Sequence, residues 1–452
     1  MAWWAKGTAR APVLGGVDGG GAVSIGPMPT TQFCAGEPSD AGLAAAYNWS
    51  FDGVGTRAAD EMCDKMRVRI HETALVYAVA ADGRLWVRSC SAKSPFANRD
   101  AQRLGSLLQK LLDAAPSPIP SVQMLVNHGD QPVMQKAQLG GGLPVFEPSC
   151  APAYWCVAMP SPFHVARALG VPGSQPPNAT AFPWAARTSK AWWRGELAVP
   201  DHTLRSTLLT LPRLKVLSIA RQRPDLMDVR LSGLDHDSLE HALGADDIGA
   251  RAHDLLLAAG LDEAEANAVA SGENYAPFAT HGPRFRFQLS LHAVISSWRL
   301  HELLLSGSAL LLQEHAVAEW LSARLVPWEH YIPVADDLSD LVARIEWLRA
   351  DDDRARRLAE SALRVGRQAA TADAVFCFFA RALDALRALP HDAELFASDA
   401  RLREAGYRPA DDVWPGRHGE GADRRRLPEN CGLGLLGQPH RGRVVCVSLA
   451  EQ

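Results

Sequence analysis

The most regular pattern of hydrophobic and polar positions lies between residues 283 and 334. Apolar and polar side chains alternate strictly over residues 285–291, and this period of two predicts a half-buried strand. Ser296 is a favourable helix start, and leucines then recur on one face, as expected for a short helix. The four apolar residues 309–312 predict a buried second strand. The stretch therefore predicts a strand–helix–strand unit, which is the building block of an open α/β sheet.

Periodicity predicts further elements on both sides of this unit. Helices are expected over residues 56–70, 101–112, 204–214, 245–270, 315–324, 338–348, 354–366 and 375–386. Strands are expected over residues 74–79, 85–87, 122–126, 225–231 and 331–334. Strands that alternate with helices along a chain are typical of α/β proteins, so the pattern indicates this fold class.

Composition narrows the class of protein without identifying it. The chain has 452 residues, which suits two or three domains, and its hydrophobic fraction of 47% supports a sizeable core. The 46 basic and 51 acidic residues give a net charge of −5, so we expect no nucleic-acid partner. No apolar run reaches the roughly 18–20 residues that cross a bilayer, so we expect no integral membrane segment.

Cysteine usage leaves two interpretations open. The cysteines are Cys34, Cys63, Cys90, Cys150, Cys156, Cys377, Cys431 and Cys446. Their spacing matches no zinc pattern, so we expect no metal centre. Scattered buried thiols are the favoured interpretation, and one to three disulfides in an oxidising compartment are the alternative.

One acidic residue, Asp130, follows the predicted strand 122–126 in a polar loop. A carboxylate beyond the carboxyl end of a buried strand sits where α/β enzymes keep catalytic groups. The sequence alone favours a simpler interpretation, in which this Asp shapes the turn before Pro132.

Two arginines follow apolar stretches of the chain. Arg194 and Gly195 end one such run, and Ser297 and Arg299 lie at the junction between the central strand and its helix. A guanidinium group at such a junction can hold a phosphate through two parallel hydrogen bonds. A surface arginine is the simpler alternative at both positions.

An ordered series of short blocks resembles glycosyltransferase family 90. The blocks are Phe-Arg-Phe-Gln-Leu-Ser-Leu at 285–291, Ser-Trp-Arg-Leu at 297–300, Leu-Leu-Ser-Gly-Ser at 304–308, Pro-Trp-Glu-His-Tyr-Ile-Pro-Val at 327–334 and Asp-Leu-Ser-Asp-Leu at 337–341. No single block is specific, but the ordered series is. The resemblance covers roughly residues 56–390.

The resemblance implies a GT-B fold, in which two Rossmann-like domains face each other across a cleft. The expected parts are a flexible extension over 1–55, an acceptor-side domain over 56–172, a donor domain over 173–371, a candidate crossing helix over 372–390 and a tail outside the resemblance over 391–452. A segment rich in Pro and Gly, residues 170–180, is the expected linker between the two domains.

The resemblance also implies an activity. Members of the family transfer glucose or xylose from a UDP-sugar to a hydroxyl of a protein or glycan acceptor, with inversion and without a metal or other cofactor. The alternative is a catalytically inactive member that binds a UDP-sugar or glycan as a partner protein. The family suggests the lumen of the endoplasmic reticulum or Golgi, although no signal peptide or retention motif is visible in the sequence.

Residue roles follow from the matching motifs. The match at Asn127, Asp130 and Pro132 implies that Asp130 is the general base. The implied donor-binding residues are Arg194, Gly195, Ser297, Arg299 and Glu319, and the implied acceptor-side residues are Tyr154, Trp155, Met159 and Phe163. The chain departs from the family pattern at Gly129, Cys156 and the pair His292–Ala293.

Overall fold

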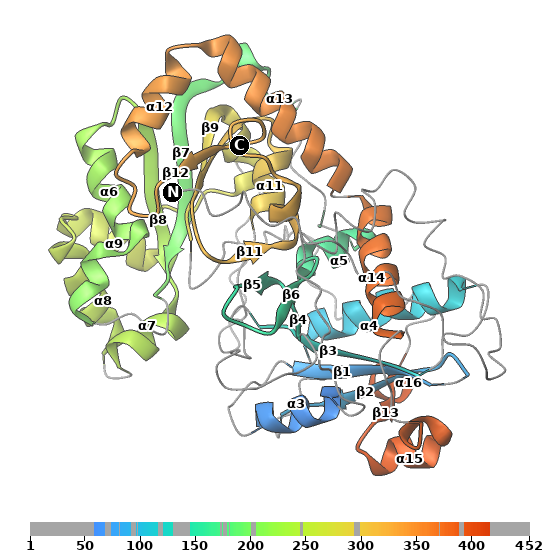
Figure 1. Ribbon diagram of the computed structural model, residues 1–452. Helices are drawn as coiled ribbons and strands as arrows, with labels where there is room; N and C mark the ends of the chain where they lie inside the picture. Colours follow the sequence, from blue (N-terminus) through green and yellow to red (C-terminus); the bar gives the residue numbers. More distant parts are fainter. Residues whose placement is uncertain are drawn as a thin grey trace, which may run out of the picture.

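The computed structural model describes most of the region that carries the resemblance. The described residues are 58–67, 74–80, 82–91, 96, 98–115, 121–129, 145–171, 174, 179, 181–199, 205–244, 247–292, 299–369, 371–387 and 393–415. Asp130, Ser297 and Ala293 lie outside these residues, as does the expected N-terminal extension. Two separate β-sheets flanked by helices dominate the described part, which confirms the α/β class (Figure 1).

The first sheet is mixed and, among the described residues, has six strands in the order β13-β2-β1-β3-β4-β6. These strands are β1 (Ala74–Val79), β2 (Leu85–Ser89), β3 (Val122–Asn127), β4 (Val145–Glu147), β6 (Cys156–Ala158) and β13 (Arg408–Pro409). The predicted hairpin is confirmed, because β1 pairs with β2 in antiparallel register. Strand β1 pairs with β3 antiparallel, whereas β3, β4 and β6 run parallel.

Helices cover both faces of the first sheet. Helix α3 (Ala58–Arg67) lies on one face, and α4 (Arg99–Ala114) and α14 (Ala372–Arg387) lie on the other (Figure 1). Asn98 caps α4 by accepting hydrogen bonds from two backbone N–H groups of its first turn. All six residues of β1 are buried, because a strand covered on both faces needs apolar side chains in both directions.

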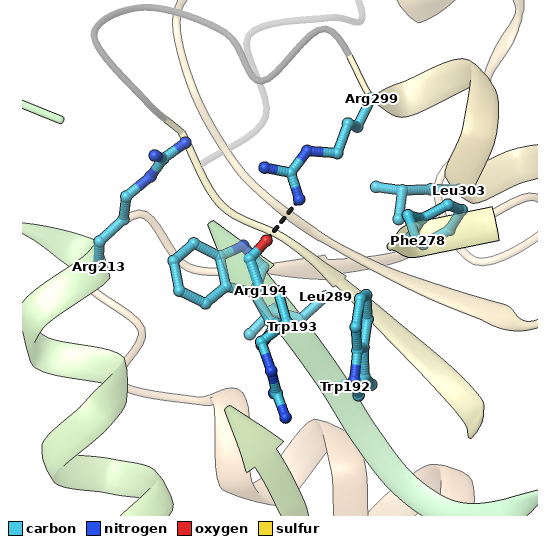
Figure 2. A pocket seen from close by; sticks show the side chains of 8 residues that line it. All are labelled: Trp192, Trp193, Arg194, Arg213, Phe278, Leu289, Arg299 and Leu303. Atoms are coloured by element: carbon cyan, nitrogen blue, oxygen red, sulfur yellow. Dashed lines mark hydrogen bonds between the residues drawn. The ribbon is translucent and has the colours of Figure 1, made fainter. Parts of the chain in front are cut away.

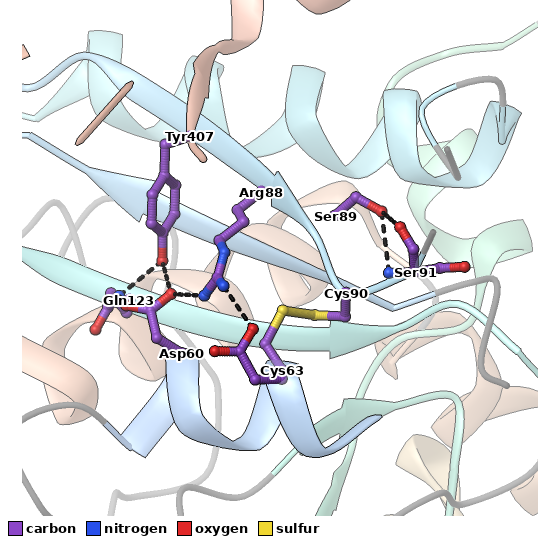
Figure 3. Close-up of polar contacts among 9 residues, drawn as sticks. Asp60, Cys63, Arg88, Ser89, Cys90, Ser91, Gln123 and Tyr407 are labelled. Atoms are coloured by element: carbon purple, nitrogen blue, oxygen red, sulfur yellow. Dashed lines mark hydrogen bonds and ion pairs between the residues drawn. A yellow bond between two sulfur atoms is a disulfide. The ribbon is translucent and has the colours of Figure 1, made fainter. Parts of the chain in front are cut away.

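A polar network fastens α3 to the sheet (Figure 3). Arg88 of β2 forms an ion pair with Asp60 of α3, and the hydroxyl of Tyr407 donates a hydrogen bond to the same carboxylate at 2.8 Å. A disulfide between Cys63 and Cys90 crosses the same interface. The network therefore joins three segments that lie far apart in the sequence.

Part of the tail that lies outside the resemblance is an integral part of this sheet. The elements there are η7 (Leu395–Ala397), α15 (Asp399–Glu404), β13 and α16 (Ala410–Val413). Strand β13 pairs with β2 at the sheet edge. The buried indole of Trp414 packs over Gly105 and donates a hydrogen bond to the Phe96 carbonyl at 2.8 Å. Burial of apolar side chains thus packs this segment, which lies outside the family motifs, against the first sheet.

The second sheet is parallel and, within the described residues, has five strands in the order β12-β10-β9-β7-β8. The strands are β7 (Thr188–Leu197), β8 (Met227–Leu234), β9 (Phe285–Ser290), β10 (Ala309–Gln313) and β12 (Ile332–Val334). From β7 the chain first adds β8 on one side and then β9, β10 and β12 on the other. The direction of winding therefore reverses between β7 and β9, at a topological switch point.

Helices connect these parallel strands or follow the last of them. They are α6 (Pro212–Gln222), α7 (His236–Leu243), α8 (Ile248–Ala258), α9 (Glu263–Ser271), α10 (Phe278–His281), α11 (Leu300–Leu305), α12 (Leu341–Arg349) and α13 (Asp352–Ala369). The predicted strand–helix–strand unit is confirmed as β9, α11 and β10, and its two strands pair in parallel. Helix α11 begins at Leu300, four residues later than predicted.

Three predicted helices are wrong in extent or type. The helix expected over 315–324 is a two-residue strand, β11 (Ala318–Glu319), followed by a 3-10 turn. The helix expected over 204–214 is a 3-10 segment that ends before Pro212, because that proline opens α6. The helix expected over 245–270 breaks into α8 and α9 at Gly260, whose φ of +89° ends the first helix.

Several contacts join the two sheets. Strand β11 pairs with β5 (Ser149–Cys150), which lies beside the first sheet. After α13 the chain returns to the first sheet, where α14 packs against α5 (Pro162–Ala168) and β3. Leucines of α11 share one buried cluster with Phe146 of β4 and Phe378 of α14. The helices between the sheets are therefore packed on both sides.

The cysteines correct the favoured interpretation of scattered thiols. Cys63 and Cys90 form one disulfide, and Cys150 and Cys156 form a second. Cys377 is also disulfide-bonded. None of the cysteines that the structure describes is free, so the alternative with disulfides is the correct one.

Candidate active site

The switch point between β7 and β9 is the place where an open parallel sheet binds ligands, beyond the carboxyl ends of its strands. A pocket lies there (Figure 2). Its lining residues are Trp192, Trp193, Arg194, Arg213, Phe278, Leu289, Arg299 and Leu303. The pocket thus combines an apolar floor with three arginines.

Arg299 precedes α11 and reaches across the switch point. Its guanidinium donates a hydrogen bond to the backbone carbonyl of Arg194 at the end of β7 (Figure 2). Burial lowers the pKa of Arg299, and the nearby carboxylates of Glu302 and Glu196 raise it. An arginine stays charged after such a shift, so a largely buried cation faces this pocket.

A second arginine of the pocket, Arg213, was missed by the sequence analysis. It lies in the first turn of α6, and its guanidinium donates to the carbonyls of His292 at 2.7 Å and Glu196 at 2.5 Å. These bonds tie the ends of β9 and β7 together. Burial and, to a smaller extent, the charge of Arg299 lower the pKa of Arg213 to about 9. The only local signal was a Pro-Arg pair at a helix start.

Arg194 is placed differently from the sequence expectation of a guanidinium paired with Arg299. Its guanidinium donates to the Asp228 carboxylate at 2.7 Å and lies 5.4 Å from the ring centre of Trp192. Figure 2 shows this side chain directed away from Arg299. Side chains alternate along a strand, so Arg194 presents only its carbonyl to Arg299. The guanidinium groups that flank the switch point are those of Arg213 and Arg299.

Gly195 lies within β7, which continues to Leu197, so the turn expected at this position is wrong. The register with β8 shifts between Gly195 and Glu196, which marks a bulge. A Cβ atom at position 195 would lie 2.5 Å from the indole of Trp193. Glycine is therefore required here by close packing at the edge of the pocket.

Glu319 lies in β11, opposite Ser149 of β5, and not on a helix. Its backbone N–H donates to the hydroxyl of Ser322 at 3.0 Å, and its carboxylate caps the following 3-10 turn. The structure thus places Glu319 in the short ladder that connects the two sheets. A hydrogen bond to a ribose hydroxyl stays a prediction.

Polar rings continue the pocket edge along β10. The rings of His292 and His315 stack with centroids 3.7 Å apart, and the His292 Nε2 atom lies 3.0 Å from the Gln313 carbonyl. Burial lowers the pKa of His315. His292 follows the carboxyl end of β9, and His315 follows that of β10. The backbone carbonyl of His292 is the one that accepts a hydrogen bond from Arg213.

The loop that carries Asp130 starts at a fixed point, although Asp130 itself lies outside the described residues. The Asn127 side chain accepts a hydrogen bond from the Gly129 N–H at 3.0 Å and donates one to Glu147 at 3.1 Å. Asn127 and Glu147 are fully buried. The carboxyl ends of β3 and β4 are therefore linked to each other by a side-chain hydrogen bond.

His128, the residue after Asn127, is also held in place at the end of β3. Its Nε2 atom lies 2.9 Å from the hydroxyl of Tyr77, which itself donates to the Ala101 carbonyl. Burial lowers the pKa of His128 to about 3, so the ring is neutral near pH 7. A neutral imidazole donor to the tyrosine oxygen fits this arrangement.

The four acceptor-side candidates are not gathered at one place. Tyr154 and Trp155 precede β6, and Met159 follows it, so the strand separates them by about 13 Å. Met159 is buried in the core. Phe163, on α5, stacks on His301 of α11 with ring centroids 5.8 Å apart. Of the four, Phe163 contacts the helix that follows Arg299.

Two features are absent from the residues that the structure describes. No group of three or more His, Cys, Asp and Glu side chains there could hold a metal ion. None of the described helices is long and apolar enough to cross a membrane.

Comparison with known proteins connects these observations to a family. The model of glycosyl transferase family 90 matches residues 55–389. The chain is 22% identical over 318 residues to protein O-glucosyltransferase 2 of Danio rerio, across 66% of this chain and 53% of the relative.

Two human proteins show a comparable similarity. Identity to protein O-glucosyltransferase 3 of Homo sapiens is 21% over 329 residues, across 69% of this chain and 54% of the relative. Identity to protein O-glucosyltransferase 1 of Homo sapiens is 25% over 206 residues, across 45% of this chain and 42% of the relative. The chain spans about half the length of the curated relatives that it matches first.

Proposed function

The chain belongs to glycosyltransferase family 90, and from this premise we propose that it transfers a sugar from a UDP-sugar donor. The proposed sugar is glucose or xylose, and the proposed acceptor is a hydroxyl of a protein or glycan. The names of the relatives, protein O-glucosyltransferases, support a protein acceptor. The observation that carries the proposal is a pair of arginines, the buried Arg213 and the partly buried Arg299, at the switch point of a parallel sheet.

The proposed architecture is of the GT-B type, with the first sheet on the acceptor side and the second sheet on the donor side. The all-parallel order of the second sheet supports a nucleotide-binding role for it. The first sheet is mixed, and its parallel strands β3, β4 and β6 carry the Asp130 loop and the acceptor-side residues.

The proposed donor site holds the diphosphate of UDP between Arg213 and Arg299. As the sugar leaves, negative charge builds up on the diphosphate, and two fixed cations stabilise that charge without a metal ion. Arg194 accepts a hydrogen bond from Arg299 through its backbone carbonyl, and Gly195 allows the close approach of the Trp193 indole beside it. Ser297 is proposed to donate a hydrogen bond to the phosphates, and Glu319 to accept one from the ribose.

Asp130 is the proposed general base. Inversion needs a single in-line displacement, and the base must come within about 2.6–3.2 Å of the acceptor hydroxyl whose proton it removes. The buried contact between Asn127 and Glu147 supports this role, because it fixes the strand ends from which the loop departs. Met159 and Phe163 lie beyond the same carboxyl edge, whereas Tyr154 and Trp155 would contact the acceptor at a more distant point.

The proposed compartment is the oxidising lumen of the secretory pathway. Disulfides persist in such compartments and are rare in the reducing cytosol. The Cys63–Cys90 and Cys150–Cys156 bridges support this proposal.

The testing experiment measures UDP release from UDP-glucose and, separately, from UDP-xylose by the purified protein. We expect release with one donor and its loss in the Asp130→Asn variant, which should still bind UDP. UDP binding without release from either donor would support the inactive alternative. In that case the first residues to restore toward the family pattern would be His292 and Ala293.

A further inference from the structure

A seam of packed side chains runs between α5, beside the first sheet, and α11, beside the second. The ring of His301 lies between two rings of α5, with centroid distances of 5.8 Å to Phe163 and 4.6 Å to His164. His164 also meets the indole of Trp320 edge-on at 5.1 Å. These aromatic contacts fix α5 against the helix that follows Arg299.

Arg167 lies one helical turn after His164 on this seam. Its Nε atom donates to the Ser174 carbonyl at 3.0 Å, which holds the guanidinium in place. Its Nη1 atom is buried and, within the described structure, has no hydrogen-bond partner. Burial lowers the pKa of Arg167, and the Glu302 carboxylate raises it, so the two charges interact across the contact between α5 and α11. A buried donor without an acceptor is costly, so this N–H group favours a ligand that supplies an acceptor.

Glu302 lies opposite, beside His301 on α11. Within the described part of the chain its carboxylate makes neither a hydrogen bond nor an ion pair. Burial raises the pKa of Glu302, and the charges of Arg299 and Arg167 lower it. The carboxylate therefore interacts electrostatically with the arginine of the proposed donor site and with the arginine of α5, without a hydrogen bond or ion pair to either one. A partly buried carboxylate of this kind is stabilised when a partner supplies hydrogen-bond donors.

The spacing on α11 suits a group attached to a phosphate. Arg299 precedes the helix, and Glu302 follows it at a separation of three residues, where side chains are neighbours about 5–6 Å apart. In a UDP-sugar, the sugar is attached to the outer phosphate of the diphosphate. When Arg299 binds the diphosphate, the sugar therefore lies next to the bound phosphate group. The acceptor Glu302 and the donor Arg167 then face that sugar from opposite sides of the seam.

The charges of this pair indicate a neutral ligand. A second anionic group would be repelled by Glu302, and a cationic group would be repelled by Arg167 and Arg299. A sugar ring carries hydroxyl groups that both donate and accept hydrogen bonds, so it can satisfy a carboxylate and a guanidinium together.

We propose that Arg167 and Glu302 bind hydroxyl groups of the sugar that is transferred, and that they set the choice of donor sugar. This inference rests on the proposed function and assigns to the donor site two residues that the family motifs do not mark. It also places the sugar between the two sheets, where an acceptor bound on the other side could reach it.

The experiment compares binding of UDP, UDP-glucose and UDP-xylose by titration calorimetry to the full chain and its variants. Glu302→Gln keeps the shape of the side chain and removes its charge, and Arg167→Gln removes the guanidinium. For each variant we expect affinity for the preferred UDP-sugar to fall about tenfold while affinity for UDP stays unchanged. Glu404→Gln, an exposed carboxylate of α15, is the matched control.

Equal losses for UDP and UDP-sugar in Glu302→Gln would overturn the inference, because the residue would then act only through Arg299. Unchanged affinity for all three ligands in both variants would also overturn it and would leave the two side chains with a structural role between the two sheets. Thermal unfolding checks that each variant folds, and Glu302→Ala replaces Glu302→Gln if it does not. Failure of the proposed function has a different signature, because the wild-type protein would then not bind UDP.

Discussion

The guanidinium of Arg299 hydrogen-bonds to the backbone carbonyl of Arg194, across the point where the winding of the parallel sheet reverses (Figure 2). This contact joins the end of β7 to the start of α11. Because the acceptor is a backbone group, the bond does not neutralise the charge of Arg299. The cation is thus held in place while its charge stays available for an anion.

Replacement of Arg299 by Ala should weaken UDP binding by at least about tenfold, because charge-assisted hydrogen bonds to a phosphate are among the strongest in proteins. Calorimetric titration with UDP measures this effect. Arg357→Ala is the matched control, since Arg357 is an exposed arginine on α13. Unchanged UDP affinity in Arg299→Ala would mean that the diphosphate binds elsewhere.

Arg213 should make anion binding sensitive to alkaline pH. Burial lowers its pKa to about 9, so the guanidinium loses its charge in a range where an exposed arginine keeps it. Affinity for inorganic pyrophosphate should therefore fall as the pH rises through 9. Pyrophosphate also loses a proton near this pH, so the effect is measured as the difference between the wild type and a variant without the guanidinium.

The control for this pH dependence is Arg213→Gln. This variant should bind pyrophosphate weakly at neutral pH and show a flatter profile above pH 8. The same decline in both proteins would show that another group titrates. The free energy of unfolding should change with pH in the opposite direction to pyrophosphate affinity. The unfolded chain keeps this proton up to the ordinary pKa of arginine, so the free energy of unfolding increases as the pH rises above 9.

The strands of the second sheet could be predicted from the sequence, but their order could not. Alternation over 285–291 and the apolar run 309–312 are local patterns, and the structure forms β9 and β10 there. The switch point depends on which strands become neighbours, and no local pattern contains that information. Its location became clear only from the pairing of β7 with both β8 and β9.

The site residues show the same limit. Arg194 and Arg299 were found because they lie in recognisable motifs, yet the direction of the Arg194 side chain depends on strand register and on Asp228. Arg213 was missed because 86 residues separate it from Arg299 and an ordinary helical pattern surrounds it. Only the folded sheet brings the two guanidinium groups to one pocket.

Substitution of Gly195 by Ala should destabilise the protein by about 1–3 kcal/mol, because the new methyl group would overlap the buried indole of Trp193. Urea unfolding at neutral pH measures the change. Gly249→Ala in α8 is the control, since a Cβ there meets nothing within 4 Å and alanine favours a helix. Equal stability of Gly195→Ala and wild type would show that Trp193 can move aside.

His128 should make folding sensitive to mild acid. Its pKa is about 3 in the folded protein and about 6.5 when unfolded, so the unfolded state binds more protons between these values. The free energy of unfolding should therefore fall as the pH drops below 6.5, and this single group contributes about 2 kcal/mol of the loss at pH 5.

The His128→Gln variant tests this contribution, because glutamine can still donate to Tyr77 but does not titrate. Urea unfolding at pH 7 and pH 5 should show a smaller difference between the two pH values in the variant than in the wild type. His236→Gln, at an exposed histidine, is the control and should behave as the wild type does. The same acid sensitivity in His128→Gln and wild type would place the titrating group elsewhere. His164, on the seam between α5 and α11, would then be the next residue to replace, because burial also holds its pKa well below the ordinary value.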